Sequence, residues 1–160
     1  KGASLTKKGK SIAVNIIRKH RLWEVFLVEK LDFQWDEVHE IAEQLEHIKS
    51  DELIQRLDLF LGHPDFDPHG DPIPDRNGYI KPTEKKLLSK LKKNQRGICV
   101  GVKESSATFL QYLDTRKIGI GSSITVIDKE EFDQSMTILV SNKQFFITKK
   151  IAENLYLKTI

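Results

Sequence analysis

Apolar residues in the first part of the chain recur with the period of amphipathic α-helices. Thr6 can accept a free backbone N–H at a helix start, and an apolar series follows it to about Leu31. The apolar side of this first helix is expected to consist of Ile12, Ile16, Ile17, Trp23, Leu27 and Leu31. A second helix is expected over residues 35–48, with a core-facing stripe formed by Val38, Ile41, Leu45 and Ile48.

A third helix and an irregular loop follow. Ser50 with Asp51 and Glu52 is a helix start, because acidic side chains are favourable at the positive end of the helix dipole. Gly62 can end this helix in the left-handed conformation, after apolar positions at Leu53, Ile54, Leu57 and Leu61. Four prolines and a glycine in residues 63–74 exclude regular structure, so we expect a defined but irregular loop.

Short apolar runs typical of β-strands come after a lysine-rich segment. Residues 75–96 are interpreted as a linker with a short amphipathic turn at Leu87, Leu88 and Leu91. A helical turn is expected at 108–114, Gly119 and Gly121 allow a tight bend, and strands are expected at 98–102, 123–128, 135–140, 144–148 and 154–159. Five short strands in about sixty residues favour a small closed barrel or sandwich. The predicted fold class is therefore α+β, a helical domain followed by a small β-barrel.

Composition narrows the class of protein. A chain of 160 residues with 39% hydrophobic and 31% charged content is typical of a globular protein with one domain or two small ones. No apolar run approaches the length of a membrane span and no signal peptide opens the chain, so we expect a cytoplasmic protein without a membrane partner. The single Cys99 excludes an internal disulfide and fits a reducing compartment. The net charge of +3 indicates no particular partner.

Histidine and glutamate collect on one face of the second predicted helix. At 3.6 residues per turn, the face opposite the apolar stripe carries His39, Glu43, Glu46 and His47. His20 and Glu24 stand one turn apart on the first predicted helix and can reach the same space. A charged stripe is most often a solvated surface, but two such groups together favour a divalent metal site. Imidazole with carboxylate suits manganese, iron or zinc.

Other interpretations of these residues stay open at this point. The loop contains a further candidate ligand group of His63, Asp65, Asp67 and His69, although turn chemistry explains the aspartates equally well. Residues 39–43 begin like the zinc protease signature His-Glu-x-x-His but end in Glu43, and no nucleophile motif accompanies them. Two alternatives to a non-catalytic metal site therefore stay open. One is a metallohydrolase, and the other is a structural dimer whose barrel makes protein contacts.

Several short blocks of sequence occur in an order that carries a family resemblance. They are LTKKG at 5–9, RKHRLWE at 18–24, Val38-His39, EHIKSDE at 46–52 and PHGDPIP at 68–74. Together they resemble the diphtheria-toxin-repressor and manganese-transport-regulator family of metal-dependent bacterial repressors. The C-terminal segment is similar to the SH3-like (FeoA-like) barrel of that family, mainly through residues 119–121.

The resemblance implies a domain order. A winged helix-turn-helix would precede a helical metal-sensing and dimerisation domain and an SH3-like barrel. Residues 1–6 would be the end of the DNA-binding wing, 7–74 the helical domain, 75–96 the linker and 97–160 the barrel. The recognition helix would then be absent from this sequence, which does not begin with Met and is expected to be a piece of a longer protein.

The resemblance also implies two metal sites. One set of ligands consists of His20, Glu24 and His39. The other set, nearer the DNA-binding domain and lacking the ligands of the missing first helix, consists of Glu43, Glu46 and His47. The barrel can add a ligand to the first site, for which Glu104 is a candidate and Ser105 the alternative. We expect the two sites to fail separately, with Glu46→Ala leaving the first nearly intact.

The implied function is that of a repressor without its DNA-reading part. Glu43 stands where iron-sensing members carry Cys, and a carboxylate favours a harder ion, so Mn²⁺ is the expected cofactor and Fe²⁺ the alternative. The metal would control operator binding and metal-uptake genes, with operator DNA a partner of the full-length protein only. A homodimer through the helical domain is expected, and the chain is not expected to be an enzyme.

Overall fold

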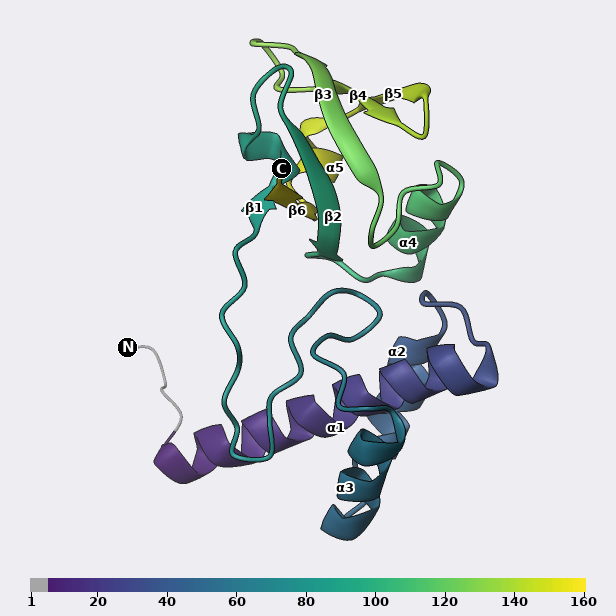
Figure 1. Ribbon diagram of the computed structural model, residues 1–160, viewed down its shortest axis with the longest axis vertical. Helices are drawn as coiled ribbons and strands as arrows, with labels where there is room; N and C mark the ends of the chain where they lie inside the picture. Colours follow the sequence, from purple (N-terminus) through teal and green to yellow (C-terminus); the bar gives the residue numbers. More distant parts are fainter. Residues whose placement is uncertain (1–5) are drawn as a thin grey trace. The chain divides into compact units, whose positions relative to one another are not determined.

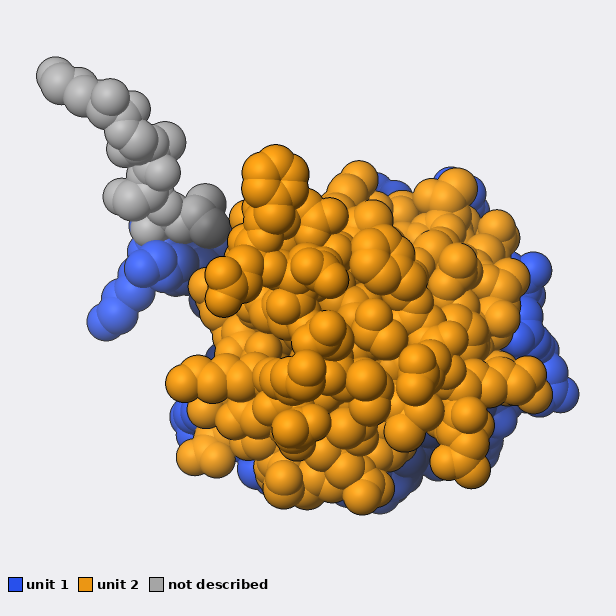
Figure 2. Space-filling view, turned by 90° about the horizontal axis from the view of Figure 1, so that it is seen from above, with its two compact units in different colours: residues 1–82 blue, residues 83–160 orange. Residues whose placement is uncertain are grey.

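The chain divides into two compact units, Lys1–Pro82 and Thr83–Ile160 (Figure 2). The computed structural model describes residues 6–160. The predicted end of a DNA-binding wing at residues 1–6 therefore lies outside the described residues, apart from Thr6. Each unit is described by itself below.

Three helices form the first unit (Figure 1). They are α1 (Lys7–Leu31), α2 (Val38–Leu45) and α3 (Asp51–Phe60). The Thr6 hydroxyl accepts the Gly9 N–H at 3.1 Å, and Asp32, in the left-handed region at φ 58°, ends α1 by donating its N–H to Leu27. The predicted first helix is thus confirmed at both ends. None of the helices within residues 6–160 combines the length and the apolar character that a membrane span requires.

The second helix is shorter than its predicted span of 35–48. Residues 35–37 form a turn, and α2 ends at Leu45. The third helix begins as predicted, because the Ser50 hydroxyl accepts the Leu53 N–H at 3.2 Å. Gly62 follows it with φ +75°, a left-handed conformation that glycine adopts without strain.

The core of the first unit contacts only the C-terminal half of α1. Its buried members are Leu22, Trp23, Val25, Leu27, Val38, Ala42, Ile54, Leu57 and Ile73. The predicted apolar side of α1 is therefore wrong for Ile12, Ile16, Ile17 and Leu31, which are 37 to 53% exposed. Helices α2 and α3 gather along the later turns of α1, whereas the loop around Gly78 runs beside the earlier turns, at Val14 (Figure 1).

Two arginines of α1 define the path of the loop after α3. Arg18 donates to the Pro74 carbonyl at 3.0 Å and to the Asp58 carboxylate at 2.9 Å. Arg21 donates to the Pro72 carbonyl, and its Nε lies 3.4 Å from Asp67 Oδ2. The loop is irregular apart from one β-bridge, so the prediction of a defined but irregular segment is confirmed.

The second unit is a six-stranded antiparallel sheet with strand order β1-β6-β2-β3-β4-β5. The elements are β1 (Lys86–Leu87), η1 (Leu88–Lys90), β2 (Arg96–Val102), α4 (Ala107–Asp114), β3 (Ser123–Lys129), β4 (Met136–Val140), β5 (Lys143–Ile147), α5 (Lys149–Ala152) and β6 (Leu155–Thr159). The predicted α+β class is confirmed, as are the five expected strands and the helical turn, with shifted ends. Gly121, at φ +87°, makes the expected bend before β3.

The predicted linker at 75–96 is wrong from Lys86 onward. Leu88 and Leu91, which were expected on an amphipathic turn, are fully buried in the core of the second unit. β1 pairs with β6, so this segment is part of the sheet. The expected turn is present as η1, but a strand of two residues carries no recognisable period, so the sequence did not reveal β1.

Candidate metal centre

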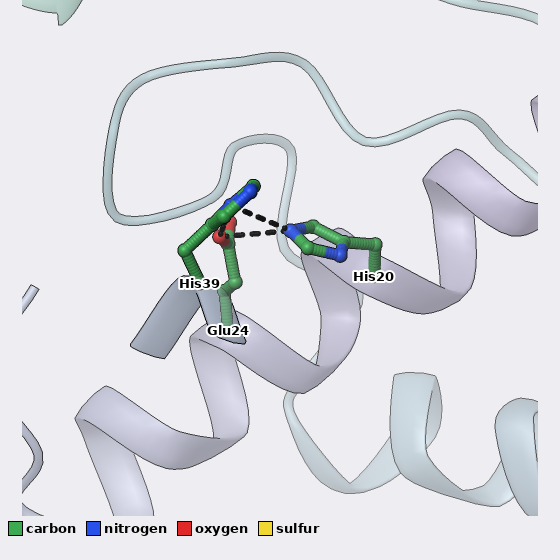
Figure 3. Close-up of side chains that lie close together, drawn as sticks. All are labelled: His20, Glu24 and His39. Carbon is green, nitrogen blue, oxygen red and sulfur yellow. Dashed lines mark hydrogen bonds and ion pairs between the residues drawn. The ribbon is translucent and has the colours of Figure 1, made fainter. Parts of the chain in front are cut away.

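Helices α1 and α2 bring His20, Glu24 and His39 together (Figure 3). His20 and Glu24 lie one turn apart on α1, and His39 is the second residue of α2. The His20 Nε2 lies 3.0 Å from Glu24 Oε1 and 3.2 Å from His39 Nδ1, and the His39 Nδ1 is 3.4 Å from the same Glu24 oxygen. Ligand atoms around one ion with bonds of about 2.1 Å lie roughly 3 to 4.2 Å apart. The three side chains therefore have the spacing of a metal centre.

Glu46 orients the imidazole of His20. The His20 Nδ1 lies 2.7 Å from Glu46 Oε2. A carboxylate can only accept, so the neutral His20 ring donates from Nδ1 and directs the lone pair of Nε2 at Glu24 and His39. A metal-binding histidine commonly donates its other N–H to a carboxylate in this way. The chemistry of the donor set thus fits a divalent ion.

Glu24 is the charged centre of the cluster. Its side chain is 2% exposed, whereas that of His39 is 57% exposed, so the cluster is closed at the carboxylate and open at His39. Burial by itself raises the pKa of Glu24, but the hydrogen bonds and positive charges that His20 and His69 supply in their protonated forms lower it to about 2. The carboxylate is therefore ionised at neutral pH and available to a cation.

The same contacts favour the protonated form of His20. Burial opposes this, but the hydrogen bonds and charges of Glu24 and Glu46 raise the pKa of His20 above its usual value. Protons and metal ions compete for the imidazole nitrogen. Protonation of His20, which Glu24 and Glu46 favour, therefore competes with the binding of a metal to this cluster.

The predicted second set is not assembled within residues 6–160. Glu46 contacts His20 of the first set, while Glu43 and His47 are exposed on the outer side of α2 and of the turn after it. Neither belongs to the groups of three or more potential ligands found among the described residues. The site at Glu43, Glu46 and His47 stays a prediction that needs ligands from a winged-helix domain.

The barrel candidate Glu104 lies in the second unit. Its carboxylate accepts a hydrogen bond from the Ser106 hydroxyl at 2.6 Å. Its contribution to the first set stays a prediction.

The structure divides the four candidate ligands of the proline-rich loop. His63 pairs with Asp58 at 2.9 Å, and Asp65 lies 3.4 Å from the Lys81 amine, so each of these two side chains has a different partner. Asp67 and His69 instead form a buried group with Glu24. The sequence did not predict this group, because Glu24 lies in a helix pattern and the other two residues in a loop pattern. The spacing of Asp67 and His69 was the only sequence signal of this group.

Matches to protein families cover both units. Residues 6–75 match the family described as iron dependent repressor, metal binding and dimerisation domain, and residues 86–159 match the FeoA domain. The chain is 43% identical over 70 residues to the iron-dependent repressor IdeR of Mycobacterium tuberculosis. It is 51% identical over 73 residues to a probable metal transport system membrane protein of Chlamydia trachomatis. These alignments cover 44% and 46% of this chain but 30% and 16% of the relatives, so the chain spans only part of their length.

Solved structures of repressors share the fold over nearly the whole chain. A manganese-dependent transcriptional repressor in complex with manganese superimposes with a TM-score of 0.91 at 31% identity, covering 98% of this chain and 75% of that one. The metal-dependent transcriptional regulator MtsR superimposes with a TM-score of 0.86 at 36% identity, covering 100% and 78%. These similarities span both units of the chain.

Proposed function

The chain belongs to the diphtheria-toxin-repressor and manganese-transport-regulator family of metal-dependent transcriptional repressors, and we propose that it senses Mn²⁺, with Fe²⁺ as the alternative. The matches correspond to the metal-binding and dimerisation domain and the FeoA domain of that family. Its members are repressors and not enzymes, so the metallohydrolase alternative is not favoured. Control of metal-uptake genes from the cytoplasm is the role we propose for the full-length protein.

The observation that carries the proposal is the convergence of His20, Glu24 and His39. Two imidazoles and one ionised carboxylate, with no thiolate, form a donor set that suits Mn²⁺ and Fe²⁺. Cys99 is no alternative ligand, because it is buried in the second unit and burial raises the pKa of its thiol to about 11. The carboxylate at Glu43, where iron-sensing members carry Cys, favours manganese as the first choice.

The ligands join two helices, which links metal binding to domain geometry. His20 and Glu24 belong to α1 and His39 to α2, and Glu46 at the end of α2 holds the His20 ring. A bound divalent ion would supply the attraction that fixes the two helices at one distance. In a full-length dimer, a metal that prefers the DNA-competent arrangement would set the angle at which two winged helices meet successive half-sites.

A homodimer through the helical unit completes the proposal. Val38 and Leu57, from the apolar faces of the second and third helices, are buried in the core of the single chain and are not available to a partner. Apolar surface left uncovered on α1 and α3 is the better candidate, and it includes Ile12, Ile16, Leu53, Leu59 and Phe60. Operator DNA is proposed as a partner of the full-length protein only, because sequence readout would come from the winged helix.

Mn²⁺ titration by isothermal calorimetry tests the metal assignment. We expect one firm site per chain that His39→Ala weakens at least 100-fold, because a ligand of the ion is lost. His63→Ala is the matched control, since His63 is an exposed histidine of the same unit that pairs with Asp58. The proposal fails if His39→Ala binds Mn²⁺ as tightly as the His63→Ala variant does.

A further inference from the structure

We propose that the second unit binds the phosphate backbone of double-stranded DNA through lysines that line one hollow of its surface. We call this site the lysine hollow, and its lysines are Lys90, Lys92, Lys93, Lys129 and Lys149. The inference rests on the proposed function, because a transcriptional repressor acts on DNA. Contacts to phosphates carry no sequence information, so the choice of operator would still depend on the winged helix of the full-length protein.

The two units carry net charges of opposite sign. Residues 83–160 contain fourteen lysines and arginines against eight aspartates and glutamates, a net charge of +6. Residues 1–82 contain twelve against fifteen, a net charge of −3. The net charge of +3 for the whole chain therefore conceals an acidic unit that repels a polyanion and a basic unit that attracts one.

The fold brings the five lysines together from three separate segments. They come from η1 and the residues after it, from the last position of β3 and from the first position of α5, and η1 packs against α5. The hollow that they line has a volume of about 650 Å³. Amines around one hollow repel one another, and an anion that enters it adds an attraction to each of them.

Lys90 and Lys92 are free to bind an anion. Both residues are exposed, and neither amine has an ion pair or a hydrogen bond among residues 6–160. Leu91 between them is 2% exposed and belongs to the core of the second unit. The buried leucine fixes the backbone from which the two amines extend, which lowers the entropy that binding costs.

Lys93 and Lys129 keep positive charge at the hollow. The Lys129 amine donates to the Ser89 carbonyl at 2.8 Å, a neutral partner that leaves its charge uncompensated. The Lys93 amine lies 2.9 Å from the Asp128 carboxylate, but these side chains are 62% and 51% exposed, and exposed pairs are weak. A phosphate can therefore compete with Asp128 for Lys93.

Three glutamates, Glu130, Glu131 and Glu153, also line the hollow. Glu153 lies 3.8 Å from the Lys149 amine, so one of the three is paired with a lysine of the hollow. The five lysines still exceed the glutamates by two, which leaves an excess of positive charge. Glu130 and Glu131 oppose an anion at this site, so their neutralisation should strengthen binding.

An anionic membrane fits this surface less well than DNA does. The phosphates along one strand can enter a hollow, whereas the surface of a bilayer is nearly flat. Phe132 is fully exposed and is the neighbour of Glu131 in the chain, so it is the apolar side chain to consider for insertion into a bilayer. Asp133 follows it, and insertion would bring two carboxylates against anionic headgroups.

Fluorescence anisotropy of a labelled duplex of arbitrary sequence, in buffer without metal, tests the lysine hollow. We expect the chain to bind a duplex of about 20 base pairs at about 50 mM salt, where attraction to phosphates is strong. The affinity should fall roughly 7- to 20-fold between about 50 and 150 mM salt, because each of two or three phosphate contacts contributes a slope of about −0.9.

The double variant Lys90→Gln, Lys92→Gln removes the two free amines. It should weaken binding at low salt by at least roughly 10-fold and reduce the salt slope by nearly 2. The double variant Lys143→Gln, Lys158→Gln is the matched control, because it removes the same charge from exposed positions of the second unit outside the hollow. The control should keep the salt slope and most of the affinity.

The double variant Glu130→Gln, Glu131→Gln should bind the duplex more tightly than the unaltered chain, because it removes two negative charges from the lining of the hollow. Equal thermal unfolding of the three double variants and the unaltered chain would show that all are folded.

Equal losses of affinity in the two lysine variants would overturn the inference, because the attraction would then come from the overall charge of the unit. Absence of binding by the unaltered chain at low salt would overturn it as well. So would equally tight binding to vesicles of phosphatidylserine, which would favour a membrane as the partner. Each of these results would leave the metal site standing, whereas failure of the proposed function would appear separately, in the Mn²⁺ titration of His39→Ala.

Discussion

At the scale of single residues, the site depends on which nitrogen of each histidine carries the proton. Glu46 accepts from His20 and the Trp35 carbonyl accepts from His69. In both rings the other nitrogen faces Glu24, each at a different carboxylate oxygen. The groups that accept these protons, Glu46 and the Trp35 carbonyl, therefore orient the imidazole nitrogens that face Glu24.

Glu46→Ala should weaken Mn²⁺ binding at the first set by roughly 10-fold or more, since partners of metal-bound histidines typically contribute 10–100-fold in affinity. The sequence led us to expect almost no effect, and the 2.7 Å hydrogen bond to His20 is the reason for revising that expectation. Calorimetry on Glu46→Ala and Glu43→Ala, which removes an exposed carboxylate of the same helix, measures the difference. Equal affinities of the two variants would contradict the orienting role of Glu46.

The sequence revealed part of the site because part of it is local. His20 and Glu24 lie one helical turn apart, and His39 shares a helix face with other ligands, so the period alone indicates their chemistry. The approach of Asp67 and His69 to Glu24 depends instead on the path of a loop. That path is set by contacts from Arg18 and Arg21 to residues 40 or more positions away, which no local pattern encodes.

At the scale of elements, predictions succeeded where a period extends over several residues. The helix starts at Thr6 and Ser50 were recognised from their capping side chains, and the strands of the second unit from short apolar runs. The exposed early turns of α1 were not recognised, because their isoleucines have the period of a buried face. Periodicity identifies an apolar face but does not say what covers it.

Arg18 connects α1 to α3 and to the loop, and its loss should destabilise the first unit. The side chains of Arg18 and Asp58 are 9% and 17% exposed. Arg18→Met removes the donor to the Pro74 carbonyl and the charged partner of the Asp58 carboxylate, which keeps its contact with His63. We expect the free energy of unfolding to fall by about 2–4 kcal/mol. Urea unfolding followed by the fluorescence of Trp23 and Trp35, both in the first unit, measures this change.

Arg56→Met is the control for this comparison. Arg56 forms an ion pair with Glu52 in which both side chains are more than 70% exposed, and such pairs contribute about 0–1 kcal/mol. Equal destabilisation by the two substitutions would show that burial of the Arg18 pair has no energetic importance.

At the scale of the whole molecule, the proposed metal sensing and the proposed dimer both involve the first unit. It holds both groups of potential metal ligands and matches a metal binding and dimerisation domain. The second unit matches the FeoA domain and has a sheet and core of its own. In a dimer through the first unit, the metal centre of each chain would therefore lie in the same unit as the interface.

Leu59→Asp should convert the proposed dimer into a monomer. Leu59 lies on α3 and is 66% exposed, so a charge there would be tolerated by the single chain but not at an apolar interface. Sedimentation at about 50 µM, where moderately tight dimers persist, distinguishes the two states. Phe132→Asp, at a fully exposed position of the second unit, should leave the dimer intact. A monomer in Phe132→Asp and a dimer in Leu59→Asp would show that the interface lies in the second unit.

Crystals of the chain grown with Mn²⁺ test the central claim most directly, through anomalous scattering near the manganese absorption edge. We expect a strong peak within bonding distance of His20 Nε2, Glu24 and His39. Crystals of His39→Ala grown in the same way should lose the strong peak. An anomalous map of the unaltered chain with no peak at His20, Glu24 and His39 would contradict the assignment of this cluster as the metal sensor.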